Sequence, residues 1–252
     1  MIKAVIFDLD GTLIRLKGAP SEIDELRDRL HVLYDGVGIT ASFHPLYADL
    51  DWAMASLDNL EERSRQEVRR QTVRLLVDYE QKFAEKCEPC LFAAEAWQLA
   101  VRRFQCGIVS NNTRSCIWST LTTNGIWESG ANYCFVGFED VTRHKPNPEP
   151  LVRLAELLNL VPGDAGLYVG DHVIDLEACQ RFNSLGGPRL SAVMVQGGKC
   201  RWEDIVAHPE YRKELSLRDL SQLPDLLVCE PSDKTEIRQA IVPGSLGNLL
   251  WH

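Results

Sequence analysis

Two carboxylates follow an apolar run near the beginning of the chain. The run Ile2–Phe7 is short and contains β-branched residues, which is typical of a buried parallel strand. Asp8 and Asp10 follow it at the sheet edge where open α/β folds bind ligands. Gly11 allows a tight turn, and Thr12 adds a hydroxyl and a backbone N–H. These residues could build a phosphate site, with one carboxylate to attack, one to carry protons, and amides to hold oxygens.

Three further segments place polar residues after short strands or in a loop. The first is a strand-like run that ends in a serine and an asparagine. The second is a proline-framed loop with one lysine ahead of a predicted helix. The third is a strand-like run followed by two aspartates four residues apart. The polar residues of these segments are Ser110 and Asn111, Lys145, and Asp171 and Asp175.

In this order the four segments resemble the four motifs of the haloacid dehalogenase superfamily. The resemblance is to its helical-cap, Mg-dependent phosphatase branch, and within it to the phosphoglycolate phosphatase group. It covers roughly residues 1–228. It implies a phosphoric monoester hydrolase with a Rossmann-like core, which is a doubly wound, mostly parallel α/β sheet, and an inserted all-helical cap.

The resemblance also implies a role for each residue. Asp8 matches the nucleophile that forms an aspartyl-phosphate, and Asp10 matches the general acid and base. Lys145 would offset charge while the phosphoryl group moves. The substrate would be held by Thr12, Ser110 and Asn111. The metal would be held by Asp8, the carbonyl of Asp10, Asp171 and Asp175, the last directly or through water.

The clustered carboxylates bear on both the cofactor and the chemistry. Four of them near one point would repel one another and a dianionic substrate, and bound Mg²⁺ would relieve both problems. In the family, dehalogenases lack the second aspartate because a halide leaving group needs no proton. The aspartate at Asp10 therefore favours phosphoryl chemistry over halide chemistry.

The hydrophobic periodicity predicts two parts and a tail. Helical patterns at 21–34, 45–58 and 61–86 predict a helical insertion, which the resemblance implies is the cap, over 14–87. Alternating helices and strands predict a mostly parallel sheet, which the resemblance implies is the catalytic core, over 1–13 and 88–228. The extension 229–252 has no predicted role. The core helices are predicted near 91–104, 113–124, 150–160 and from about 174, and the later strands at 106–110, 132–136, 166–170 and 191–196.

The composition limits the expected partners and cellular location of the protein. The chain has 252 residues and a formal net charge of −9, which argues against nucleic acid as the main partner. The first strand begins at residue 2, which leaves no room for a signal peptide, and no apolar run approaches membrane-spanning length. The expectation is a cytoplasmic monomer or homodimer that acts on a small phosphorylated metabolite, without a membrane partner.

Some patterns leave alternatives open. Cys87 and Cys90 form a CxxC pair that could bind metal or act in redox chemistry, but incidental thiols are favoured because no second ligand pair follows. Trp251 could pack on the core or form an interface. Five arginines at 63, 65, 69, 70 and 74 could reach a distal group of the substrate or form a solvated face.

Two other functions compete with the phosphatase. A phosphomutase of the β-phosphoglucomutase type would use the same residues and return the phosphoryl group to a sugar. A catalytically silent scaffold would keep the fold to bind a partner. Retention of all the motif residues argues against the scaffold.

Overall fold

The centre of the molecule is a parallel sheet. The structure is a computed structural model, and it describes residues 2–16, 23–126, 134–196 and 215–228. Its six strands lie in the order β5-β4-β1-β6-β7-β8, and neighbouring strands are parallel throughout. The first strand, β1 (Ile2–Phe7), lies between β4 (Gln105–Val109) and β6 (Ala165–Gly170). The outer strands are β5 (Cys134–Val136), β7 (Arg189–Val195) and β8 (Leu215–Leu217). The predicted fold class is therefore confirmed.

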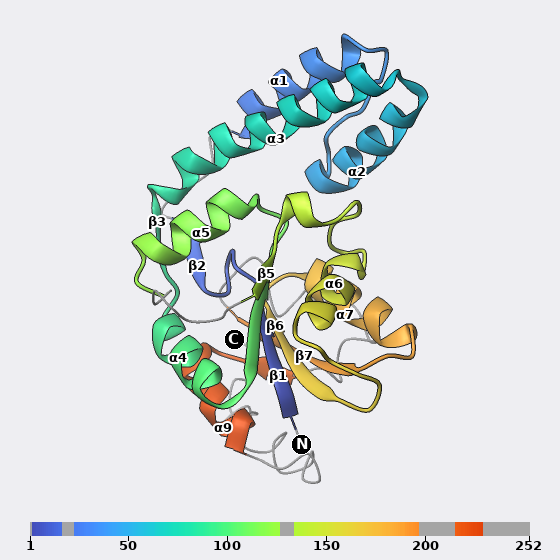
Figure 1. The fold of residues 1–252 in the computed structure, drawn as a ribbon. Helices are drawn as coiled ribbons and strands as arrows, with labels where there is room; N and C mark the ends of the chain where they lie inside the picture. The colour runs from blue at the N-terminus through green and yellow to red at the C-terminus, as the bar shows by residue number, and fades with distance from the viewer. Residues whose placement is uncertain (1, 17–22, 127–133, 197–214, 229–252) are drawn as a thin grey trace, which may run out of the picture.

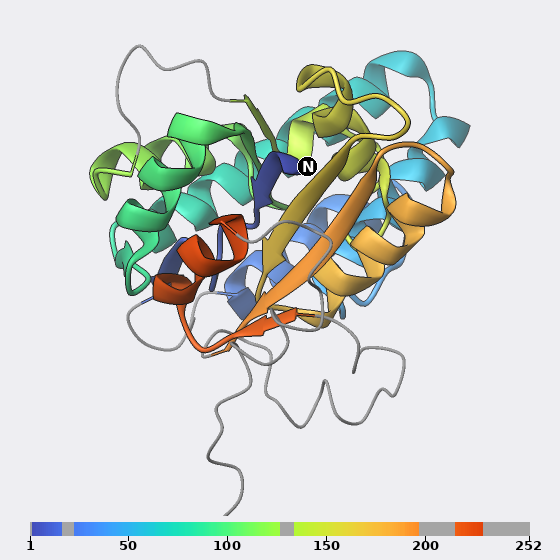
Figure 2. The same ribbon diagram turned by 90° about the horizontal axis from the view of Figure 1, so that it is seen from below.

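Helices cover both faces of this sheet (Figures 1 and 2). One face packs against α4 (Ala93–Arg103), α5 (Arg114–Thr123) and α9 (Leu223–Val228). The other packs against α6 (Glu149–Leu157) and α7 (Val173–Ser184). Successive side chains of a strand point to opposite faces, so Val5 and Phe7 join the first core and Ala4 and Ile6 the second. Burial on both faces explains why β1 is an uninterrupted apolar run after Lys3.

Three helices lie outside the sheet, beyond the carboxyl ends of its strands (Figure 1). They are α1 (Ile23–Asp35), α2 (Leu46–Ser56) and α3 (Glu62–Ala84), and a short 3₁₀ turn, Leu57–Asn59, follows α2. They share a hydrophobic cluster, which includes Leu30, Tyr34, Leu50 and Leu76 and into which Phe138, after β5, also packs. The apolar spacing of 3.6 residues that predicted these helices is the spacing that forms this cluster.

The structure also contains elements that the sequence patterns did not predict. An antiparallel ribbon of β2 (Ile14–Leu16) and β3 (Cys87–Pro89) joins the three outer helices to the sheet. Each of its strands has three residues, too few to show an alternating pattern. Strand β8, helix α9 and the 3₁₀ turns Phe138–Asp140 and Leu220–Gln222 were also missed. The expectations for the tail 229–252 lie outside the described residues.

Within the described ranges, every helix is too short or too polar to cross a lipid bilayer.

Candidate active site

The predicted site residues converge at the carboxyl edge of the sheet. Asp8 follows β1, Ser110 follows β4 and Asp171 follows β6, which are three adjacent strands. With Lys145 and Asp175 they line a cavity of about 510 Å³ that the three outer helices also line. This is the edge at which a parallel sheet binds ligands, next to the point where the strand order reverses: β4 and β5 lie on one side of β1, and β6, β7 and β8 lie on the other.

Lys145 connects the carboxylates within this cavity. Its buried ammonium group donates to Oδ1 of Asp8 at 2.5 Å and to Oδ1 of Asp175 at 2.7 Å. The loop is fixed by Asn111, whose side chain donates to the carbonyl of Lys145 at 3.2 Å and accepts from its N–H at 3.0 Å. The structure therefore places the Asn111 side chain on the lysine loop, and its backbone amide remains the group proposed for the substrate.

Both carboxylate oxygens of Asp175 are engaged by the protein. Oδ1 accepts from Lys145 and from the Tyr168 hydroxyl at 2.8 Å. Oδ2 accepts from the backbone N–H of His172 at 3.1 Å, at the start of α7. These bonds make Asp175 the residue that orients Lys145.

Gly11 makes room for Asp171. Its φ is +90°, and a Cβ atom built on it would lie 2.0 Å from Oδ2 of Asp171. Any side chain at this position would push the carboxylate away, so the glycine allows the β1 loop to approach the β6 loop.

Three carboxylates are placed to hold a cation. Asp8, Asp171 and Asp175 each offer an oxygen within 4.8 Å of the others, and they form the single such group found in the described ranges. The Asp10 side chain is outside this group, and its Oδ2 accepts from Asn112 Nδ2 at 2.6 Å. Oxygen ligands of this kind suit a hard divalent cation, so the residues present fit a Mg²⁺ site.

The charges of the cluster also favour a bound cation. Burial raises the pKa of Asp8 well above its usual range, Lys145 opposes this, and Asp175, Asp171 and Asp10 raise it further. Burial alone would lower the pKa of Lys145, but the carboxylates of Asp175 and Asp8 raise it above its usual value. The lysine is therefore charged, and one lysine does not balance the surrounding aspartates. An added cation would do so.

The two predicted hydroxyl groups differ in position. Ser110 lines the cavity, and its Oγ accepts from the N–H of Asn112 at 3.1 Å. Thr12 is fully buried outside the cavity lining, and its N–H donates to the carbonyl of Leu9 at 3.3 Å. The structure therefore brings Ser110, but not the Thr12 side chain, to the cavity.

The outer helices contribute residues that the sequence motifs did not indicate. Arg27 from α1, Tyr47 from α2 and Glu80 from α3 line the cavity. None of the five arginines at 63, 65, 69, 70 and 74 lines it; Arg65 and Arg70, for example, pair with Glu62 and Glu67 on their own helix. No short motif marks the lining residues, because only the packing of the helices determines which face meets the cavity.

Glu80 binds the beginning of α5. It is 2% exposed, and it accepts from the Thr113 N–H at 3.0 Å and from the Thr113 hydroxyl. Burial raises the pKa of Glu80 to about 8, although the bonds from Thr113 lower it. One buried group thus connects α3 to the core.

The CxxC pair lies where the chain returns to the sheet. Cys87 is in β3, and the N–H of Cys90 donates to the carbonyl of Leu13 at 2.9 Å. Burial raises the pKa of both thiols to about 12. Protonated thiols are poor nucleophiles and poor metal ligands, which favours incidental thiols.

Comparisons with known proteins give one family match and several structures with a similar fold. A family model described as haloacid dehalogenase-like hydrolase matches residues 2–183. No curated protein matches the chain. Among solved structures, one described as a haloacid dehalogenase-like hydrolase, from Bacteroides fragilis, is 21% identical with a TM-score of 0.59, over 88% of this chain and 100% of that one.

Two other solved structures share the fold. A predicted phosphoglycolate phosphatase from Haemophilus somnus is 19% identical with a TM-score of 0.51, over 90% of this chain and 98% of that one. A structure described as a β-phosphoglucomutase, from Thermotoga maritima, is 18% identical with a TM-score of 0.51, over 90% and 98%.

Proposed function

This chain belongs to the haloacid dehalogenase-like hydrolases, and on that premise we propose that it is a Mg²⁺-dependent phosphatase of a small phosphomonoester. The observation that carries the proposal is the buried contact between Asp8 and Lys145, at the cavity that Asp171 and Asp175 also line. A carboxylate held beside a lysine is placed to attack phosphorus while the charge is offset. The similarity to the phosphoglycolate phosphatase from H. somnus supports the substrate class.

The reaction has two steps. In the first, an oxygen of Asp8 bonds to phosphorus, the bond to the leaving oxygen breaks, and Asp10 gives that oxygen a proton. In the second, water attacks the aspartyl-phosphate, Asp10 takes the proton from the water, and Asp8 and inorganic phosphate are released. Lys145 and the Ser110 hydroxyl hold phosphoryl oxygens in both steps.

The cation would be held by Asp8, the carbonyl of Asp10 and Asp171. Asp175, whose carboxylate also accepts hydrogen bonds from Lys145, Tyr168 and His172, would hold it directly or through water. A divalent cation there supplies positive charge that shields the nucleophile from the phosphoryl oxygens.

We also propose that residues 14–87 act as a cap over the core formed by 1–13 and 88–228. The hydrophobic cluster that joins α1, α2 and α3, and the cavity between these helices and the carboxyl edge of the sheet, support this division. A cytoplasmic location is part of the proposal, supported by the free thiols of Cys90, Cys106 and Cys116. Cell fractionation would test the location, and detection of the protein outside the cytoplasm would contradict it.

A panel of phosphomonoesters, assayed for phosphate release with Mg²⁺ and with chelator, tests the function. We expect Mg²⁺-dependent release and a phosphoryl adduct on the peptide that contains Asp8. Inactivity across the panel would contradict the proposal and favour the silent scaffold.

The second candidate is a phosphomutase, which the resemblance to the T. maritima structure favours. It would use the same residues but return the phosphoryl group to a sugar hydroxyl. Isomerised sugar phosphate without accumulation of inorganic phosphate would support the mutase over the phosphatase.

A further inference from the structure

The side chain of Asn112 connects an outer helix to Asp10. Its Nδ2 donates to Oδ2 of Asp10 at 2.6 Å, and its Oδ1 accepts from the Tyr47 hydroxyl at 3.3 Å. A carboxylate only accepts hydrogen bonds, so the amide nitrogen must face Asp10 and the amide oxygen must face Tyr47. The three side chains form one continuous path from α2 to the loop after β1.

The backbone of Asn112 is fixed. Its N–H donates to Ser110 Oγ at 3.1 Å, and its carbonyl accepts from the N–H of Phe138 at 2.8 Å. The residue is 9% exposed. A donor held in this way fixes the plane of the Asp10 carboxyl group, and therefore the direction of its second oxygen.

Tyr47 is held in place at the other end of the path. Its ring packs on Phe138 and His144, with centroids 6.4 and 6.0 Å away. Burial raises the pKa of its hydroxyl well above the usual value, so the group stays protonated and can donate. In the same helix, Asp51 accepts from the His144 N–H at 2.8 Å. The tyrosine reaches Asn112 only while α2 lies against the core.

We propose that Asn112 is a positioning residue for the acid and base Asp10, and that Tyr47 supports this amide from the cap. The inference rests on the proposed phosphatase function. Asn112 holds the carboxyl group in the orientation that delivers a proton to the leaving oxygen. When α2 separates from the core, Asn112 loses its second anchor.

The test compares leaving groups in the first turnover of the full-length protein with Mg²⁺. The substrates are 4-nitrophenyl phosphate, whose leaving group needs no proton, and an alkyl phosphate that the wild type hydrolyses. For Asn112→Ala we expect the alkyl phosphate to be cleaved about 10-fold more slowly, because the carboxyl group that gives the proton loses the hydrogen bond that orients it. Release of nitrophenolate should change by less than about threefold, and KM should stay near its wild-type value.

Tyr47→Phe keeps the ring and removes only the hydroxyl, so folding should be preserved. We expect a two- to fivefold loss, on the order of a neutral hydrogen bond, again confined to the alkyl phosphate. The double variant should be no slower than Asn112→Ala, because Tyr47 acts through Asn112. Cys116→Ala is the matched control: Cys116 Sγ lies 3.8 Å from the same amide nitrogen, and its loss should leave both rates within twofold.

Three results would overturn the inference: equal losses with both leaving groups, additive effects in the double variant, or unchanged rates in Asn112→Ala. In each case the wild type would still hydrolyse phosphate esters, and the proposed function would stand. A wild type without Asp8-dependent hydrolysis would remove both the function and the inference.

Discussion

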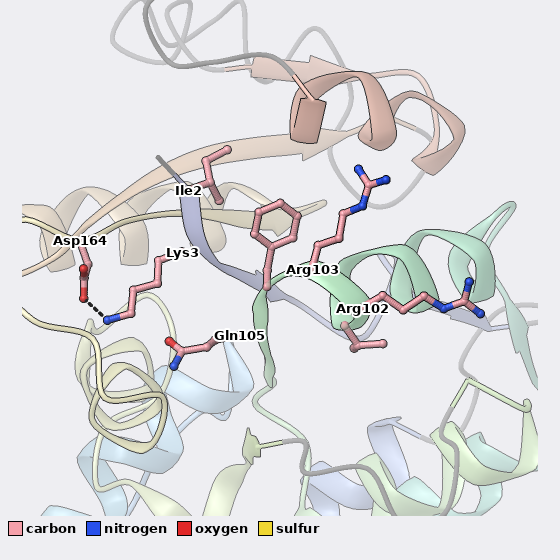
Figure 3. Close-up of a pocket in the computed structure, with 8 residues that line it drawn as sticks. Ile2, Lys3, Arg102, Arg103, Gln105 and Asp164 are labelled. Atoms are coloured by element: carbon pink, nitrogen blue, oxygen red, sulfur yellow. Dashed lines mark hydrogen bonds and ion pairs between the residues drawn. The ribbon is translucent and has the colours of Figure 1, made fainter.

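The two edges of the sheet each carry a hollow, and the two hollows are similar in size but not in chemistry. The cavity at the carboxyl edge has a volume of about 510 Å³, and the hollow at the amino edge one of about 580 Å³. Ile2, Gln105 and Asp164, at or beside the first residues of three strands, line the amino-edge hollow (Figure 3).

The charges behave differently at the two edges. At the amino edge, Lys3 pairs with Asp164 at 2.7 Å, while Arg102 and Arg103 are exposed and extend in different directions (Figure 3). Both arginines are in the last turn of α4, where cations stabilise the helix dipole. At the carboxyl edge, Asp8 and Lys145 are buried and point at each other. The volumes of the two hollows therefore do not distinguish the candidate active site. The buried, converging charges of Asp8 and Lys145 do.

The largest expected effect contrasts one aspartate from each edge. Asp8→Asn keeps the shape but removes the nucleophile, so turnover should fall by about 10³-fold or more. Asp164→Asn, at the amino edge, removes the charge that pairs with Lys3 and keeps an oxygen that can accept from the Val161 N–H, so turnover should stay within about twofold. Steady-state phosphate release measures both. An Asp8→Asn variant with more than about a tenth of the wild-type rate would show that Asp8 is not the nucleophile.

Removal of the metal should abolish activity, because the cation would be held at the carboxyl edge of the sheet. Activity should disappear with chelator, return with Mg²⁺ and be inhibited by Ca²⁺, whose looser coordination misplaces the nucleophile. Phosphate release during stepwise addition of each cation measures this. Full activity in chelator would contradict the assigned site, because the clustered carboxylates would then repel the substrate.

Substitution of Asp10 should reduce the rate in a different way from substitution of Asp8. Asp10→Asn should slow alkyl phosphates by roughly 10²-fold, since their leaving oxygen needs a proton. With 4-nitrophenyl phosphate it should give a burst of nitrophenolate followed by a slow steady state, because hydrolysis of the intermediate needs a base. Rapid mixing would detect the burst. An equal loss of rate with both substrates, and no burst, would show that Asp10 has only a structural or metal-binding role.

A smaller effect should come from the buried carboxyl group of Glu80. Its pKa of about 8 in the folded protein lies above its usual value of 4.5. Between these values the folded state holds a proton that the unfolded state has lost, so stability falls as the pH rises through this window. Glu80→Gln removes the titration, so its melting temperature should rise relative to that of the wild type by roughly 7–14 °C from pH 5 to pH 8.

The control for Glu80 is an exposed carboxylate that binds the start of α5, the helix that Glu80 also binds. Glu139 accepts from the Arg114 N–H at 2.8 Å at the start of α5. Glu139→Gln, measured in parallel, gives the change in melting temperature that comes from losing an exposed carboxylate at the start of α5. A Glu80→Gln difference that does not increase from pH 5 to pH 8 would show that burial does not hold the proton.

The smallest effect should come from the arginines of the amino edge. Arg102→Ala and Arg103→Ala remove exposed charges that face no common point, so turnover and KM should stay within about twofold. Kinetics on the best substrate of the panel would measure this. A tenfold change in KM would break the comparison and make the amino-edge hollow part of substrate binding.

The local sequence was enough to predict the fold class and where the candidate site lies. A buried parallel strand is an apolar run, and polar residues directly after such a run must leave the sheet at its carboxyl edge. For this reason Asp8, Ser110, Asp171 and the class of fold could be predicted from short segments. The helical periodicity of α1, α2 and α3 likewise predicted an insertion outside the sheet.

Only the tertiary structure decided which long-range contacts complete the site. Asp175 looks like a second metal ligand in the sequence, but the fold engages both of its oxygens with Lys145, Tyr168 and His172. Tyr47 and Glu80 belong to no motif, and they reach Asn112 and Thr113 because of how α2 and α3 pack on the core. Periodicity shows that a helix has a buried face, whereas the partner of each side chain on that face depends on the packing of segments far apart in the chain.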